Sequence, residues 1–371
     1  MDVDKGDTIT GAPFVGQSTK ATIHRRDKDY YFDDGSAIFL VGTRLFKIHK
    51  TLLTRGSPFF QMMFALPSGA IDQDGQSDDR PIRCYDSLRD FRALCWALYA
   101  GPSEILAQAN PKTMDISKMI SITVLGQKYD FKILMDWALD MLEGFLAKAK
   151  GNFIDKVQDW DRVGKIFVIS KQSGRSTLAH RIEEDWLHHI LDREPYALTN
   201  ALIMAEGSPE FRTFHAKAYY NHLKASGVFK SKPSEKDVRF IHEIAAPETN
   251  YLQSLNDTQK LRILQGFWSL SLLKIELAKV PGPKLPDNPA CATHARDCAQ
   301  VWREWWEDLF DEAEYHDKPL EDPWNIIEAA SKKASKPMKD PEPPCDDMIR
   351  AGVKKMAEDF FSGLADRFMI P

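Results

Sequence analysis

The fold of the N-terminal third is decided by the stretch Ala37-Ile-Phe-Leu-Val41, Gly42-Thr43, Leu45-Phe-Lys-Ile-His49. Its first segment is a short apolar run rich in strand-forming residues, and its last segment alternates apolar and polar side chains. The Gly-Thr pair between them is a turn signal, so the pattern predicts a β-hairpin. Because a hairpin is not stable alone in water, the residues around it must supply a covering layer.

The residues after the hairpin switch to helical spacing. In residues 50–65 apolar side chains recur every three or four positions, and Pro58 stands where a second helix would begin. Residues 81–85 predict one more short strand, and Ser87 with Asp90 predicts the N-cap of the next helix. From there on nearly all segments have helical periodicity. We therefore predict an α+β fold, with short strands and a helical cluster followed by an all-α region.

Changes in composition divide the chain of 371 residues into four parts. We expect a mobile polar arm, a mixed domain, a helical extension and a C-terminal helical region; these are residues 1–24, 25–150, 151–230 and 231–371. The last region should contain a Pro-rich linker at residues 332–344. We expect its helices at residues 257–280, 290–315 and 346–368.

Charge and cysteine usage limit the classes of function. The 49 basic and 54 acidic residues give a net charge of −5, which does not favour binding to nucleic acid or to a membrane surface. No apolar run approaches the ~20 residues that cross a bilayer. Five cysteines in a chain of this length argue against a disulfide scaffold and favour a reducing compartment, cytoplasmic or nuclear.

The segment from residue 31 to 146 resembles a BTB/POZ domain, over about a third of the chain. The resemblance rests on the order of its motifs, which is more specific than any one of them. These are Phe32-Asp-Asp-Gly-Ser-Ala-Ile-Phe-Leu-Val41, Phe46-Lys-Ile-His-Lys-Thr-Leu-Leu53, Ser57-Pro-Phe-Phe-Gln-Met-Met-Phe64, Phe91-Arg-Ala-Leu-Cys-Trp-Ala-Leu-Tyr-Ala100 and Gly126-Gln-Lys-Tyr-Asp130. With its all-helical remainder, the chain is similar to fungal BTB-domain proteins.

The resemblance implies a non-enzymatic protein–protein interaction module that forms a homodimer through the hairpin and first helix. The apolar residues available for this interface or for the core are Phe39, Leu52, Leu53, Phe59 and Phe60. The resemblance gives His49 a structural role, and it places Ser36 where many members carry an aspartate that pairs with the basic residue after the histidine.

Some members of the family are substrate adaptors for cullin-type ubiquitin ligases, and the resemblance leaves this narrower role open. Those members often have an apolar-x-Glu motif in the loop after the second helix. Here residues 66–79 contain no glutamate, and Ile71-Asp-Gln73 is a poor substitute.

The residue types and the spacing of Cys291, His294 and Cys298 resemble those of metal ligands. On a helix they would share a face, but a structural zinc ion normally has four ligands. The fourth would have to come from far away in the sequence, from Cys345 or His316. A helix that packs an apolar stripe explains the same pattern, since a free cysteine behaves as a small buried hydrophobe. We therefore expect no metal here.

Two further clusters have a structural interpretation that we prefer to a catalytic or ligand-binding one. Glu183, Glu184, His188 and His189 include an i,i+4 pair, which is typical of a solvated helix surface. Trp302, Trp305 and Trp306 could be a ligand platform, but their helical spacing favours core packing or a partner-binding anchor. The lysines of Ser331-Lys-Lys-Ala-Ser-Lys336 are too few for a targeting patch and fit a solvated segment.

The sequence contains no common nucleotide-binding, hydrolase or zinc-protease motif. We therefore predict no catalytic residue, no cofactor and no enzymatic activity. The alternative is a helical enzyme or ligand-binding protein with its site in the helical region. A concave pocket lined by convergent polar groups would favour that alternative.

Overall fold

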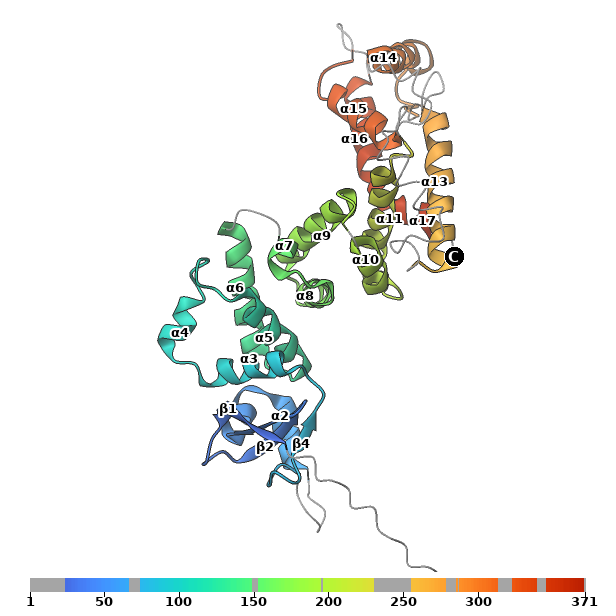
Figure 1. Ribbon diagram of the computed structural model, residues 1–371. Coiled ribbons are helices and arrows are strands. Elements are labelled where there is room, and N and C mark those ends of the chain that lie inside the picture. The colour runs from blue at the N-terminus through green and yellow to red at the C-terminus, as the bar shows by residue number, and fades with distance from the viewer. Residues whose placement is uncertain are drawn as a thin grey trace, which may run out of the picture. The chain divides into compact units, whose positions relative to one another are not determined.

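In a computed structural model of the chain, the described residues are 24–66, 74–148, 153–194, 196–229, 255–277, 285, 287–312, 322–338 and 345–369. They form an α+β fold in which a small four-stranded sheet near the N-terminus is followed by helices (Figure 1). The predicted arm at residues 1–24, apart from His24, lies outside the described residues.

The chain divides into two compact units. Met1–Ile105 and Ser121–Trp137 form the first, and Leu106–Ile120 and Ala138–Pro371 form the second. The domain boundaries that the sequence predicts, at residues 150/151 and 230/231, fall among residues outside the described set.

The sheet of the first unit contains the predicted hairpin. Its strands are β1 (Arg25–Tyr31), β2 (Ala37–Val41), β3 (Arg44–Ile48) and β4 (Ile82–Cys84), in the order β1-β3-β2-β4. β2 and β3 are antiparallel, with Phe39 opposite Phe46, which confirms the hairpin. β4 runs parallel to β2 and confirms the short strand predicted at residues 81–85.

Strand β1 was not predicted, because five of its seven residues are charged and the other two are tyrosines. It pairs in parallel with the edge of β3, with an irregular register between Arg26 and Tyr31. Asp27 faces inward, where Arg92 Nη2 lies 2.7 Å from its carboxylate. Thus a long-range ion pair and main-chain pairing, rather than an apolar pattern, hold this strand in place.

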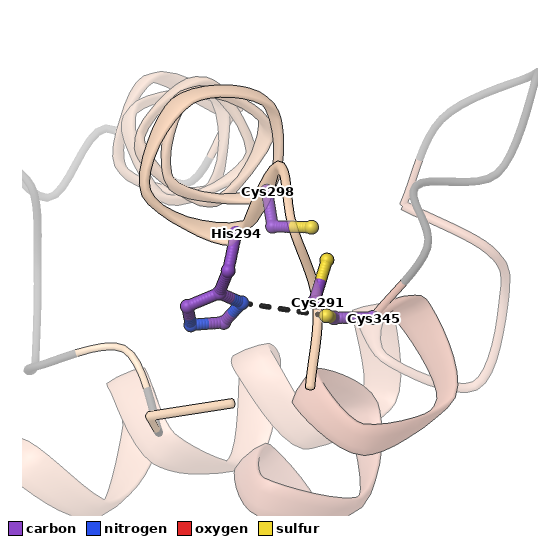
Figure 2. Close-up of side chains that lie close together, drawn as sticks. All are labelled: Cys291, His294, Cys298 and Cys345. Atoms are coloured by element: carbon purple, nitrogen blue, oxygen red, sulfur yellow. Dashed lines mark hydrogen bonds between the residues drawn. The ribbon is translucent and has the colours of Figure 1, made fainter. Parts of the chain in front are cut away.

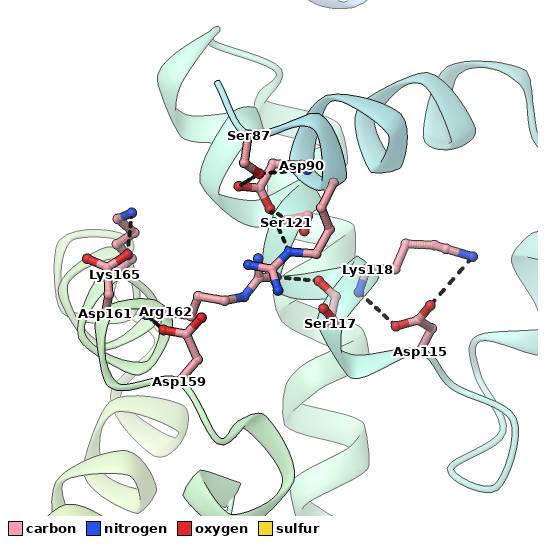
Figure 3. Close-up of polar contacts among 11 residues, drawn as sticks. Ser87, Asp90, Asp115, Ser117, Lys118, Ser121, Asp159, Asp161, Arg162 and Lys165 are labelled. Carbon is pink, nitrogen blue, oxygen red and sulfur yellow. Dashed lines mark hydrogen bonds and ion pairs between the residues drawn. The ribbon is translucent and has the colours of Figure 1, made fainter. Parts of the chain in front are cut away.

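Helices follow the hairpin as predicted. In the first unit they are α1 (Lys50–Gly56), α2 (Pro58–Ala65), α3 (Leu88–Tyr99) and parts of α4 (Pro102–Ala107), α5 (Ile116–Lys128) and α6 (Lys132–Lys148). Pro58 occupies the first turn of α2, and the Ser57 hydroxyl caps that helix by accepting from the Phe60 N–H. Ser87 caps α3 in the predicted way, and Asp90 also accepts a hydrogen bond from Ser121 (Figure 3).

One face of the sheet packs on these helices and forms the core of the first unit. The strands contribute Ala37, Phe39, Val41, Phe46 and Ile48, and the helices contribute Leu53, Phe60, Phe91, Leu94, Cys95 and Leu125. Ile38, Leu40 and Leu45 form a smaller buried cluster with the half-buried Tyr31. Because both faces of β2 are covered, all five of its residues are buried.

The second unit is helical. Besides the remaining parts of α4, α5 and α6, its elements are α7 (Phe153–Val157), α8 (Trp160–Gln172), α9 (Ser176–Leu191), α10 (Ala197–Ala205), η1 (Pro209–Phe211), α11 (Arg212–Ser226), α13 (Asp257–Leu277), η2 (His294–Cys298), α14 (Ala299–Glu312), α15 (Pro323–Lys333), α16 (Asp346–Ser362) and α17 (Leu364–Phe368). Within it, Arg162 of α8 donates to the Ser117 carbonyl (Figure 3).

Three details of the second unit differ from the sequence-based expectation. The helix expected at residues 290–315 begins instead with the π-helical turn η2 at His294, and the final helix is broken at Gly363. Helix α15 extends to Lys333, inside the predicted linker, whose residues 339–344 lie outside the described set. Among the described residues, no helix has both the length and the apolar character needed to cross a membrane.

Candidate functional site

Four potential metal ligands converge in the second unit: Cys291, His294, Cys298 and Cys345 (Figure 2). One ligand atom from each lies within 4.8 Å of those of the other three. The Nδ1 atom of His294 is 3.3 Å from the Cys345 sulfur. The structure therefore joins the three clustered residues to Cys345, one of the two distant residues considered from sequence. The other, His316, lies outside the described residues.

Separate segments position these side chains. Cys291 lies in the turn before η2, where its N–H donates to the Asn288 carbonyl. His294 and Cys298 are the first and last residues of η2. Cys345 is the N-cap residue of α16, and the amide of Asn288 donates to its sulfur over 3.3 Å. The cluster thus brings Cys345 next to residues that precede it by 47 to 54 positions in the sequence.

The environments of the thiols differ. Cys298 and Cys345 are buried, whereas Cys291 and His294 are partly exposed. Burial, with a hydrogen bond to Cys345, raises the pKa of the Cys298 thiol to about 11. A backbone hydrogen bond from Thr293 lowers the pKa of Cys291. All three cysteines are free thiols rather than disulfides.

The candidate acid/base residues on α9 do not form the pair that the sequence suggested. Glu184 contacts His180 at 3.2 Å, and His188 contacts Asp192 at 3.2 Å. All four of these side chains are more than half exposed, so these are solvated helix-surface contacts.

The two neighbouring residues on α9 are buried and have structural partners. Glu183 is held between Lys171 and Lys217, and the His189 ring packs against Trp160. The four residues therefore do not converge on one site.

The tryptophan cluster of α14 is core. Trp302, Trp305 and Trp306 are buried against one another, and the Trp306 indole donates to the Leu277 carbonyl over 2.8 Å. In the basic segment of residues 331–336, the Lys332 side chain is 73% exposed and pairs with Glu328, which fits the solvated segment expected from sequence, and Lys333 lies over the Trp305 ring. An exposed ligand platform of these three tryptophans is excluded by their burial.

His49 lies where β3 meets α1, as the resemblance implied, and is half-buried. Its main-chain N–H donates to the Tyr99 hydroxyl over 2.9 Å, and its Nδ1 atom is 2.8 Å from the same hydroxyl. The other ring nitrogen is 3.2 Å from Asp34. At the position where many family members carry an aspartate, the Ser36 hydroxyl accepts from the Lys50 N–H and so caps α1.

The structure decides which of the apolar residues near the hairpin are available for association. Phe39, Leu53 and Phe60 belong to the core. Phe59 is 39% exposed, Met62 66% and Leu66 69%. Phe59 and Met62 are three residues apart on α2 and so share a face, and Leu66 is the C-cap residue of that helix. We call these three residues the α2 apolar face. Met62 and Leu66 could not be singled out from sequence, because their exposure depends on which side chains the rest of the chain covers.

A depression of about 280 Å³ lies beside the ends of β2 and β4. It is lined by Leu40, Gly42, Arg83, Cys84, Tyr85 and Asp86. Burial raises the pKa of the Cys84 thiol to about 11, and Asp86 is already bonded to Lys128 and Tyr129. This depression belongs to the sheet unit, so it does not favour a ligand site in the helical region.

Comparisons of the chain with protein-family models, curated proteins and solved structures found no match.

Proposed function

We propose that the chain is a non-enzymatic protein–protein interaction module that self-associates through the α2 apolar face of a BTB/POZ-like N-terminal region. The observation that carries this proposal is the exposure of Phe59 and Met62 on α2 and of Leu66 at the C-cap of that helix. Single exposed apolar residues are common on soluble proteins, whereas a contiguous apolar patch often marks an interaction site.

The architecture of the first unit supports the proposal. The first unit contains the β2–β3 hairpin followed by α1 and α2, and the family that the sequence resembles commonly forms a two-fold dimer through its hairpin and first helix. In a two-fold dimer the same patch of both copies meets, so three side chains contribute twice. With about 1.5–3 kcal/mol for each fully buried large side chain, less the cost of association, a dissociation constant in the micromolar range (about −8 kcal/mol) is expected.

The narrower role of a cullin-ligase adaptor is not part of this proposal. It depends on the loop after α2, and residues 67–73 of that loop lie outside the described residues. The proposal therefore concerns self-association alone.

Sedimentation velocity of the full chain over a range of concentrations tests the proposal. The wild-type chain should shift from monomer to dimer in the micromolar range, and the double variant Met62→Glu, Leu66→Glu should remain monomeric because it would bury four like charges in a two-fold contact. Ile203→Glu on α10 is the matched control, since Ile203 is 65% exposed but lies in the second unit. It should dimerise like the wild type.

A wild-type chain that stays monomeric at high concentration would refute self-association. A dimer that persists in the double variant would refute the α2 apolar face as its interface. Circular dichroism of each variant checks that the helical content is unchanged.

A further inference from the structure

We infer that Cys291, His294, Cys298 and Cys345 form a structural zinc site. This reverses the expectation from sequence, which was based on three ligands within one helix. In a tetrahedral site with Zn–S bonds of about 2.3 Å, neighbouring ligand atoms are separated by about 3.8 Å. No two of the four ligand atoms in this chain are more than 4.8 Å apart, and one pair is at 3.3 Å. Small side-chain rotations therefore suffice to enclose an ion.

The donor chemistry selects the metal. Three thiols and one imidazole make a Cys₃His set, which is among the standard ligand sets of structural zinc. Soft sulfur ligands in a tetrahedral arrangement disfavour magnesium and calcium, which prefer oxygen ligands. Because all four positions are filled by protein atoms, no site is left for a water molecule or a substrate. The site would therefore stabilise the fold and not catalyse a reaction.

The surroundings of the ligands fit a metal site. The Nδ1 atom of His294 points toward the Cys345 sulfur (Figure 2). The Asn288 amide donates a hydrogen bond to the Cys345 sulfur, and donors of this kind stabilise and orient a coordinated thiolate. The turn that carries His294 and Cys298 is π-helical, a local irregularity that is frequent at functional sites.

Packing of an apolar stripe does not explain these features. Cys298 is fully buried one turn before Trp302, at the start of the stripe of α14, whose tryptophans pack against one another. That packing accounts for Cys298 and for the helix from Ala299 onward, but it does not account for the His294 imidazole, whose Nδ1 atom lies 3.3 Å from the Cys345 sulfur. A bound ion explains the convergence of all four side chains, because each supplies one ligand atom.

Zinc at this position would tie the start of α14 to the start of α16. Residues 313–321 and 339–344, between these elements, lie outside the described set. A tie between Cys298 and Cys345 closes a long loop, and such a constraint stabilises the folded state by reducing the freedom of the unfolded chain.

The test is elemental analysis of the untagged full chain, purified without chelator from zinc-supplemented cells. We expect one zinc ion per chain, and we expect the double variant Cys298→Ser, Cys345→Ser to lose it. The matched control is Cys84→Ser, which removes a partly buried cysteine of the first unit and should keep one zinc ion per chain. Cobalt substitution should give the ligand-field absorption bands of a tetrahedral thiolate site in the wild type and the control.

A second measurement guards against a variant that merely misfolds. In the wild type, a strong chelator should lower the thermal midpoint, and added zinc should restore it. In the double variant the midpoint should not respond to either. A wild-type chain that binds no zinc or cobalt, a double variant that keeps its ion, or a denatured mass lower by two hydrogens, which indicates a disulfide, would each overturn the inference.

Discussion

Asp27 and Arg92 form an ion pair that fastens strand β1 to helix α3. The Asp27 side chain has no exposed surface, while Arg92 is 36% exposed, and the guanidinium lies 2.7 Å from the carboxylate. The second oxygen of Asp27 accepts from the N–H groups of Asp29 and Tyr30. The carboxylate thus organises the strand locally and also joins it to a helix 65 residues away.

Substituting Arg92 should lower the free energy of unfolding more than substituting Asp27. Arg92→Met leaves a buried carboxylate without its counter-charge, so we expect the free energy of unfolding to fall by about 3 kcal/mol. Asp27→Asn should be milder, because asparagine retains an oxygen acceptor for both N–H groups and Arg92 can reach water. Urea denaturation followed by circular dichroism measures both variants. Equal losses would contradict this asymmetry.

The Tyr99 hydroxyl should stabilise the junction of β3 and α1. Tyr99→Phe keeps the ring but removes the acceptor for the His49 N–H, so we expect a loss of about 1 kcal/mol. Tyr85→Phe is the control, because Tyr85 is 92% exposed, and it should be neutral. Thermal unfolding of the three proteins distinguishes them. A Tyr99→Phe chain as stable as the wild type would show that water replaces the hydroxyl.

Gly266 permits helix α13 to pack against Phe368 of α17. A Cβ atom at this glycine would overlap the Phe368 ring, which is buried and stacked on Tyr219. We expect Gly266→Ala to lower stability by about 1–3 kcal/mol through overpacking, despite the better helix propensity of alanine. Adding Phe368→Leu should recover part of the loss.

The control for this prediction is Gly144→Ala on α6. Gly144 is exposed, and a Cβ atom there would have no neighbour within 4 Å. That variant should gain about 0.5–1 kcal/mol from helix propensity. Differential scanning calorimetry measures the two changes, and a gain in both variants would contradict the close contact of α13 with α17.

Acid should destabilise the second unit through His222 of α11. Burial, together with the nearby charge of Arg193, lowers the pKa of this histidine from 6.5 to about 4. Between these two values the unfolded chain binds a proton and the folded chain does not, so folding loses stability as the pH falls from 6.5 toward 4. The full effect of such a shift is about 3 kcal/mol, at 1.36 kcal/mol per unit.

Comparing the wild type with the His222→Leu variant isolates the contribution of His222 to acid sensitivity. The difference in thermal midpoint between pH 7.5 and pH 5 should be smaller in this variant than in the wild type. His215 on the same helix also has a pKa lowered to about 4, first by burial and then by Arg262, so some acid sensitivity should remain. Identical pH dependence of the two proteins would exclude His222 as a contributor.

The sequence by itself determined the secondary-structure elements whose signals lie within a few neighbouring residues. Strand alternation and a turn fix the hairpin of β2 and β3, and Ser57 with Pro58 and Ser87 with Asp90 fix two helix starts, because each signal acts within a few residues. Helical periodicity likewise predicted the helices that the structure describes after residue 85.

Only the tertiary structure decided which residues far apart in the sequence meet. Strand β1 has no apolar pattern; main-chain pairing with β3 and the ion pair of Asp27 with Arg92 hold it in place. Which apolar residues of α2 remain exposed depends on what the rest of the chain covers. Cys345 could not be selected as the fourth member of the cluster from sequence, since spacing along a helix carries no information about a residue 47 positions beyond Cys298. Through-space convergence follows from packing of the whole unit, and packing depends on all of its side chains together.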